Sequence, residues 1–154
     1  MKPSQYVKQR LLAFACLITI SAGAFATKGV SISEKLLQSF KATFPDAREV
    51  KWHEETDMYT VDFTESNILT KVRYDKDGNF IGSLRYYTEK NLPVNVLCKL
   101  QKKYAGLKVF GVTEVTTESS VEYYIKLEDD TTWTTVRANI DGSMQVVEKY
   151  KKAS

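Results

Sequence analysis

The fold is decided by residues 50–87, which read VKWHEETDMYTVDFTESNILTKVRYDKDGNFIGSLRYY. Within this stretch, Tyr59–Phe63 and Thr70–Tyr74 alternate apolar and polar residues, as half-buried strands do because successive side chains point to opposite faces of a sheet. A third such segment, Phe80–Tyr87, follows the tight-turn dipeptide Asp77-Gly78. This stretch therefore predicts antiparallel strands joined by short turns.

The same pattern recurs 64 positions later in the chain. The corresponding segments are Tyr59–Phe63 and Tyr123–Leu127, Thr70–Arg73 and Thr134–Arg137, and Asp77-Gly78 and Asp141-Gly142. No linker or low-complexity run separates the two copies. We therefore predict two tandem repeats, residues 27–91 and 92–154, within one continuous unit.

Each repeat begins with apolar residues at helical spacing. The first helix is predicted to start at Ser31 and Glu34, which have the spacing of a capping box, and to end at Pro45. The second is predicted to have Pro93 in its first turn. The apolar positions are Leu36, Leu37, Phe40 and Phe44 in the first helix, and Val96, Leu97, Leu100 and Tyr104 in the second. The predicted fold class is α+β, with each helix packed on one face of an antiparallel sheet.

The first 26 residues read as a signal peptide. Basic residues between positions 2 and 10 precede an apolar run, Leu11–Ile20, that is too short to span a bilayer comfortably. Small residues at Ala24 and Ala26 predict cleavage after Ala26. The mature protein is therefore expected to be periplasmic or secreted, with no stable membrane insertion after cleavage.

Removal of this leader changes the charge balance. Lys2, Lys8 and Arg10 account for three of the 22 basic residues, which leaves 19 against 19 acidic residues, so the mature chain is formally neutral. Binding to phosphate backbones relies on a net or clustered positive field, so we expect no nucleic-acid partner. The remaining 128 residues are enough for one compact domain.

Four segments of the first repeat point to a family. They are Phe44-Pro45-Asp46-Ala47, Val50-Lys51-Trp52, Tyr59–Phe63 and Tyr74–Gly78. In this order they resemble the F-P-x-A, V-x-W, Y-x-V-x-F and D-x-x-G pattern of the PepSY-like proteins grouped with β-lactamase inhibitory protein. The pattern is degraded in the second repeat, where Val112 stands in place of Trp52. The resemblance implies an exported bacterial protein of two helix-plus-sheet units, and it carries over no catalytic residues.

The sequence predicts no catalytic centre, cofactor or metal site. His53 is the single histidine, and Cys98 is the single cysteine after cleavage, whereas zinc sites and catalytic triads need several such groups. Asp75, Asp77 and Asn79 are spaced like the start of a calcium loop, but no acidic residue closes it, and we interpret them as a turn. His53 is interpreted as a solvated strand residue and Cys98 as a small buried hydrophobe.

The sheet face that the helices leave open is the predicted binding surface. Leu84 and Tyr86 are assigned to the helix-covered face. The residues assigned to the open face are Lys71, Arg73, Arg85 and Tyr87 in the first repeat, and Tyr124, Lys126, Trp133, Thr135, Arg137, Val147 and Lys149 in the second. Tyrosine, tryptophan and arginine dominate the energetics of protein interfaces because they combine a large area with a polar group.

We therefore predict a non-enzymatic module that captures an unknown protein or peptide, in one form as an inhibitor of a secreted hydrolase. The predicted partner-binding residues are Arg73, Tyr87, Tyr124, Trp133 and Arg137. Tyr124 and Trp133 are expected to act as apolar anchors, although Trp133 could instead pack against the other sheet or a long loop. The two arginines are expected to orient carboxylates.

Two alternatives remain open. A small-ligand sensor or carrier would enclose its ligand between the two sheets in an apolar pocket. A structural protein of the cell envelope would have an evenly polar open face.

Overall fold

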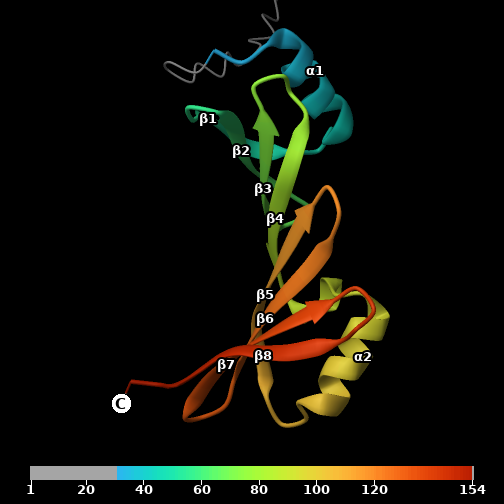
Figure 1. Ribbon diagram of the computed structural model, residues 1–154, viewed down its shortest axis with the longest axis vertical. Coiled ribbons are helices and arrows are strands. Elements are labelled where there is room, and N and C mark those ends of the chain that lie inside the picture. The colour runs from blue at the N-terminus through green and yellow to red at the C-terminus, as the bar shows by residue number, and fades with distance from the viewer. Residues whose placement is uncertain (1–30, 154) are drawn as a thin grey trace, which may run out of the picture.

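In the computed structural model, which describes residues 31–153, the strands form one antiparallel sheet in the order β1 to β8 (Figure 1). The chain builds the first half from α1 (Glu34–Thr43), β1 (Arg48–Glu54), β2 (Met58–Glu65), β3 (Ile68–Asp75) and β4 (Phe80–Tyr87). The second half contains the 3-10 helix η1 (Glu89–Asn91), α2 (Val94–Lys103), β5 (Lys108–Thr117), β6 (Val121–Glu128), β7 (Thr132–Asn139) and β8 (Met144–Lys151). The predicted α+β class is confirmed.

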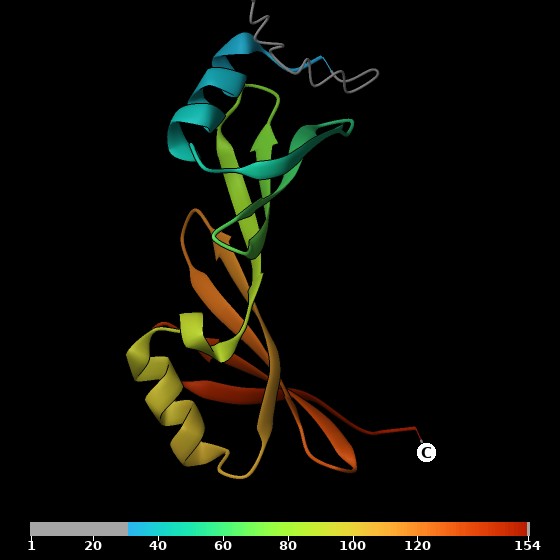
Figure 2. The same ribbon diagram turned by 180° about the vertical axis from the view of Figure 1, so that it is seen from behind.

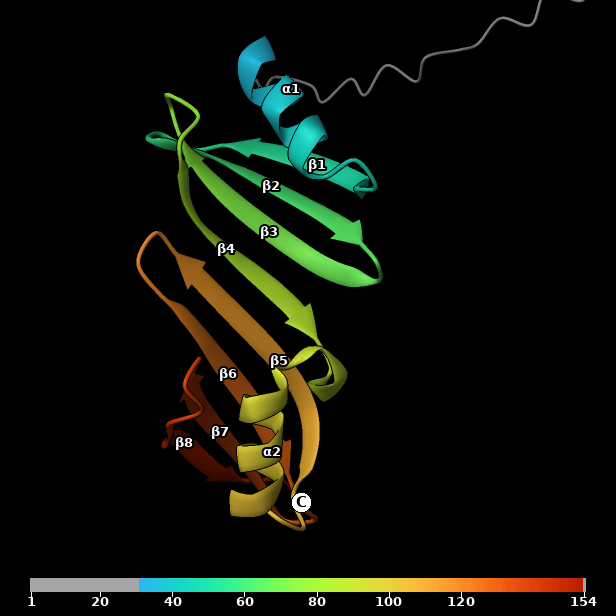
Figure 3. The ribbon, with the colours of Figure 1, turned by 90° about the vertical axis from the view of Figure 1, so that its right-hand side faces the viewer.

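The two helices lie on the same side of the sheet, α1 over the first four strands and α2 over the last four (Figures 2 and 3). Each covers its own apolar cluster. The cluster under α1 contains Leu36, Phe40, Trp52, Tyr59, Val61, Phe63 and Val72, and that under α2 contains Val96, Leu100, Val112, Tyr123, Ile125, Leu127, Val136 and Ala138. Because β4 and β5 are paired, the two clusters lie on one sheet. Residues 31–153 contain no second sheet, so a ligand site enclosed between two sheets is not formed by these residues.

The start of α1 differs from the predicted capping box. Ser33 is the N-cap, and its hydroxyl accepts a hydrogen bond of 3.2 Å from the backbone N–H of Leu36. The carbonyl of Ser31 instead accepts a hydrogen bond from the Tyr59 hydroxyl at 3.1 Å. The helix therefore begins two residues later than a Ser31 cap requires, because Ser33 satisfies a free amide of the first turn.

A β-bulge in β4 reverses the faces predicted for that strand. Arg73 pairs with Gly82 and Tyr74 pairs with Phe80, so Ile81 is an extra residue in the ladder. A shift of one residue moves every following side chain to the other face. The assignment of Arg85 and Tyr87 to the open face and of Leu84 and Tyr86 to the covered face is therefore wrong, and the two pairs exchange places.

Gly82 lies at the junction of the two halves, where β4 meets β5. A Cβ atom on Gly82 would lie 2.8 Å from the carbonyl oxygen of Thr116, a backbone atom of the neighbouring strand that cannot swing aside. We expect Gly82→Ala to lower the free energy of unfolding by about 1–3 kcal/mol through this overpacking. Urea denaturation followed by circular dichroism measures the change.

Gly111 provides the matched control, because a Cβ atom there meets nothing within 4 Å. Gly111→Ala is expected to change stability by less than about 0.5 kcal/mol, as substitutions without new contacts usually do. Equal losses in the two variants would contradict the close approach of β4 to β5.

The predicted signal peptide, residues 1–26, and its cleavage after Ala26 lie outside the described residues. Within residues 31–153, none of the helices has both the length and the apolar character that crossing a membrane requires.

Candidate binding site on the open sheet face

The strand register places four of the five predicted binding residues on the open face. Tyr124 is opposite Arg137, and both lie between residues that point into the core under α2. Trp133 pairs with Glu128 and alternates with the buried Thr134, so its side chain leaves the sheet away from α2. Arg73 pairs with Thr60 and Gly82 on the same face of the first half.

Trp133 is the centre of an aromatic and basic cluster. The ring of Phe110 meets the Trp133 ring edge-on, with centroids 4.9 Å apart. The ammonium groups of Lys126 and Lys152 lie 4.8 and 4.6 Å from the Trp133 ring centroid, within the range of cation–π attraction. Tyr150, the register partner of Trp133, completes this Trp133 cluster and also contacts Lys126. Trp133 is thus partly covered, whereas Phe110 remains 62% exposed.

Phe110 and Tyr150 were not among the predicted site residues. The ladder shifts between Val109 and Gly111 in β5 and between Thr135 and Val136 in β7, opposite an extra residue, Val147, in β8. Lys149 consequently pairs with the buried Thr134 on the covered face, so its predicted open-face position is wrong. Strict alternation could not place these two aromatic residues, because Phe110 is itself the extra residue of β5 and Tyr150 follows the extra residue of β8.

Tyr124 and Arg137 share one acidic neighbour. The Tyr124 hydroxyl donates a hydrogen bond of 3.1 Å to Glu122 Oε2, and Arg137 Nη1 lies 3.9 Å from Glu122 Oε1. The Arg137 side chain is 39% exposed, so this loose pairing orients the guanidinium and leaves donors available to a partner. Exposed pairs of this kind contribute little stability.

Apolar side chains continue the open face across its middle. Leu69 pairs with Tyr86, and Leu84 pairs with Val115 on the neighbouring strand. Leu69 is 52% exposed and Tyr86 is 39% exposed. The centre of the open face is therefore apolar. A structural protein of the cell envelope was expected to have an evenly polar open face, and this surface does not fit that expectation.

Arg73 belongs to a separate, more polar part of this face. It lies on β3, four strands from Arg137 on β7, which corresponds to about 19 Å at the usual strand spacing. On the neighbouring strand, Asp62 pairs with Lys71 and with His53, each at 3.3 Å. The structure therefore places Tyr124, Trp133 and Arg137 on the same face of the adjacent strands β6 and β7, with Tyr124 directly opposite Arg137, but it places Arg73 apart from them.

Tyr87 is the predicted site residue that does not lie on the open face. It is only 8% exposed, and its hydroxyl donates a 2.6 Å hydrogen bond to Glu114 Oε2 on the helix side. Burial, reinforced by the Glu114 carboxylate, raises the pKa of Tyr87 well above its usual range. Arg85 Nη1 contacts the other oxygen of Glu114 at 3.1 Å.

Cys98, predicted to be buried, is exposed on α2.

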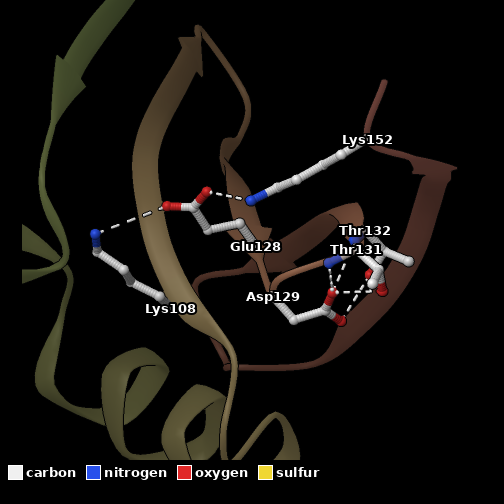
Figure 4. A network of polar contacts seen from close by, with 6 residues as sticks. All are labelled: Lys108, Glu128, Asp129, Thr131, Thr132 and Lys152. Atoms are coloured by element: carbon white, nitrogen blue, oxygen red, sulfur yellow. Dashed lines mark hydrogen bonds and ion pairs between the residues drawn. The ribbon is translucent and has the colours of Figure 1, made fainter. Parts of the chain in front are cut away.

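Polar contacts join Lys152, near the C-terminus, to Glu128 at the end of β6 (Figure 4). Glu128 accepts from Lys152 at 2.8 Å and lies 3.8 Å from Lys108 Nζ. The backbone N–H of Lys152 also donates to the carbonyl of Thr131 at 2.8 Å. These contacts fix the Lys152 ammonium group near the Trp133 ring.

Asp129 organises the β6–β7 turn next to this cluster. Its carboxylate accepts from the Thr132 hydroxyl, the backbone N–H groups of Thr131 and Thr132, and the Thr131 hydroxyl, at 2.7–3.1 Å. These hydrogen bonds, that from the Thr132 hydroxyl foremost, hold the pKa of Asp129 well below its usual range.

In the Asp129→Asn variant, folding stability is expected to depend less on pH between neutral and acidic conditions than it does in the unmodified protein. Because the pKa of Asp129 is lower in the folded than in the unfolded chain, its contribution is complete above the unfolded value of about 4 and is lost as the pH falls through the folded value. Melting temperatures between neutral and acidic pH should therefore converge for the two proteins as the pH falls. A constant difference across that range would contradict this role.

Comparisons with known proteins identify the fold. No protein-family model matches the chain, and neither does any curated protein sequence. The structure is similar to that of a BLIP-like protein from Bacteroides fragilis, with 19% identity, a TM-score of 0.60, and coverage of 79% of this chain and 87% of that one. A DUF2874 family protein from Bacteroides ovatus matches with 19% identity, a TM-score of 0.60, and coverage of 80% and 89%. A presumed periplasmic protein from Bacteroides eggerthii matches with 16% identity, a TM-score of 0.59, and coverage of 79% and 90%. At this identity the comparisons establish a shared fold.

Proposed function

We propose that this protein is an exported, non-enzymatic binding module that captures a protein or peptide on its open sheet face. The observation that carries the proposal is the Trp133 cluster, in which an exposed Phe110 lies against a tryptophan flanked by two lysines. Protein interfaces are enriched in aromatic anchors and arginine, and a polar rim surrounds them. Tyr124 and Arg137 extend this surface toward the middle of the sheet, and Arg73 is a more distant contact.

The partner is expected to carry carboxylates beside an apolar residue. Arg137 has guanidinium donors beyond its loose contact with Glu122, and Lys126 adds positive charge next to the aromatic rings, whereas the charge of Lys152 is compensated by Glu128. Inhibition of a secreted hydrolase is one form of such binding, and the fold of the BLIP-like neighbour is compatible with it.

The proposal includes an architecture of two tandem units, residues 27–91 and 92–154. In its support, each half has the order helix and then four strands, and both helices bury matching positions, Leu36 and Phe40 in α1 and Val96 and Leu100 in α2. A periplasmic or secreted location, after cleavage behind Ala26, is supported by the leader pattern and by the presumed periplasmic neighbour.

The test is capture of a partner from a cell-envelope extract by residues 27–154, in parallel with a Trp133→Ala/Arg137→Ala variant. A partner retained by the unmodified chain should be lost by the variant, and raised salt should weaken its retention because charged contacts are screened. Melting temperatures establish that the variant folds.

The matched control carries equivalent changes on the helix side, Val94→Ala and Lys90→Ala, where Val94 is 75% exposed. This control should retain the partner fully. A partner held equally by all three proteins would place the binding surface elsewhere, and a partner lost only by the control would assign it to the helix side.

A further inference from the structure

A groove runs along the helix-covered side of β3 and β4, opposite the open face. It has a volume of about 670 Å³, within the range of small-molecule sites. One wall is the end of α1, with Ser39, Thr43 and Phe44, and the floor is formed by Ile68, Thr70, Val72 and Tyr74 of β3 with Ser83 and Arg85 of β4. From Ile68 to Tyr74 the floor is about 20 Å long at the usual rise of a strand.

The floor of the groove suits a hydrocarbon chain better than a peptide. β3 and β4 are interior strands, paired on both sides, so their backbone N–H and C=O groups are already used in the sheet. An added peptide strand would bury its own backbone groups without partners, which is costly. The apolar surfaces of Tyr74 and Phe80 at the far end can instead contact a hydrocarbon chain, and Phe80 is 36% exposed.

The other end of the groove provides a hydrogen-bond donor with little net charge. Thr70 pairs with Arg85 across the strands, and Arg85 lines the end of the groove that Glu65 and Ser66 also line. Glu114, only 13% exposed, holds Arg85 Nη1 at 3.1 Å and compensates its charge. The remaining guanidinium N–H groups can donate to a carbonyl oxygen, whereas a carboxylate would also face Glu65 and Glu114.

We propose that this groove binds an uncharged single-chain acyl ester or amide, whose carbonyl accepts from Arg85 while its hydrocarbon chain lies along Tyr74 and Phe80. This site is independent of the open face, so the protein can hold such a ligand and a partner on opposite sides of one sheet. The proposed site differs from the carrier that the sequence suggested, because its ligand would lie between a helix and a sheet and not between two sheets.

The test is titration of residues 27–154 with monodecanoylglycerol below its micelle-forming concentration, followed by calorimetry and by amide NMR. We expect saturable binding, with shifts concentrated in residues 39–44, 65–74 and 80–85. Decanoate, which has the same chain and a charged head, is expected to bind at least about tenfold more weakly, a difference that calorimetry resolves readily.

Two variants block the groove from opposite walls. Ser83→Phe fills it from β4, and Ser39→Trp fills it from an exposed position of α1 where the substitution leaves the core unchanged. Each should weaken binding of the ester by about tenfold or more. Leu84→Phe, one residue along β4 on the open face, is the matched control and should bind as the unmodified chain does.

The absence of saturable binding would overturn the proposal, as would equal binding by the blocked and control variants at unchanged melting temperature. Decanoate binding as tightly as the ester would overturn the assignment of an uncharged head. Loss of partner capture by Trp133→Ala/Arg137→Ala with unchanged ester binding would support both sites separately.

Discussion

Replacement of Phe63 by alanine is expected to lower the free energy of unfolding by about 3–5 kcal/mol, the usual range for removing a buried phenylalanine. Phe63 is 1% exposed, and its ring lies 5.2 Å from that of Phe40 and 4.7 Å from that of Phe44, measured between centroids. Alanine would leave a cavity between α1 and the sheet and would remove both aromatic contacts. Urea denaturation with circular dichroism measures the loss.

Phe110→Ala is the matched control, because the same side chain is removed from a position that is 62% exposed. Its expected loss is below about 1 kcal/mol, since little apolar surface returns to water. If the two variants lost equal stability, the packing of α1 on the sheet through Phe63 would be refuted.

Removal of the Glu114 carboxylate is expected to have the second largest effect. Glu114 lies on β5 and joins the two halves of the sheet through Arg85 and the Tyr87 hydroxyl, both on β4. In Glu114→Ala, the tyrosine hydroxyl loses its partner in a buried position, and the arginine loses its compensating charge. Because the Arg85 side chain is 40% exposed and can turn to water, we expect a loss of about 2–3 kcal/mol, below that of a fully buried pair.

A double-mutant cycle with Arg85→Ala separates the pair from its neighbours. The double variant should lose less free energy of unfolding than the two single variants together, because it no longer contains the unpaired arginine that Glu114→Ala leaves behind. Glu122→Ala is the control on the open face, where the carboxylate is 30% exposed and its contact with Arg137 is 3.9 Å long, and its expected loss is below about 1 kcal/mol. A larger loss at Glu122 than at Glu114 would contradict the assigned role of the β4–β5 junction.

Much of the architecture could be predicted from local patterns. Alternation at Tyr59–Phe63 and at Tyr123–Leu127 identified strands whose inward residues are buried, and the dipeptides Asp77-Gly78 and Asp141-Gly142 lie in turns with glycine at positive φ. These predictions succeeded because side-chain direction in a strand and backbone freedom at glycine depend on the residue and its immediate neighbours.

The candidate sites were predicted less completely. Tyr124, Trp133 and Arg137 lie on the open face as expected, whereas Tyr87 lies on the other face and Phe110 and Tyr150 were missed. Each error involves a strand with a bulge: Tyr87 and Tyr150 follow an extra residue, which reverses their phase, and Phe110 is itself the extra residue of β5. The alternation of apolar and polar residues within one strand cannot reveal such a residue, because a bulge is defined by how that strand pairs with its neighbour.

Local periodicity and turn chemistry were enough to predict the helices and strands, the α+β class and the apolar positions of the two helices. The pairing of β4 with β5, which joins the halves into one sheet, and the groove that α1 leaves beside Arg85 could not be predicted in this way. These features arise from contacts between residues distant in the chain, such as Arg85 and Glu114, and no local pattern encodes them.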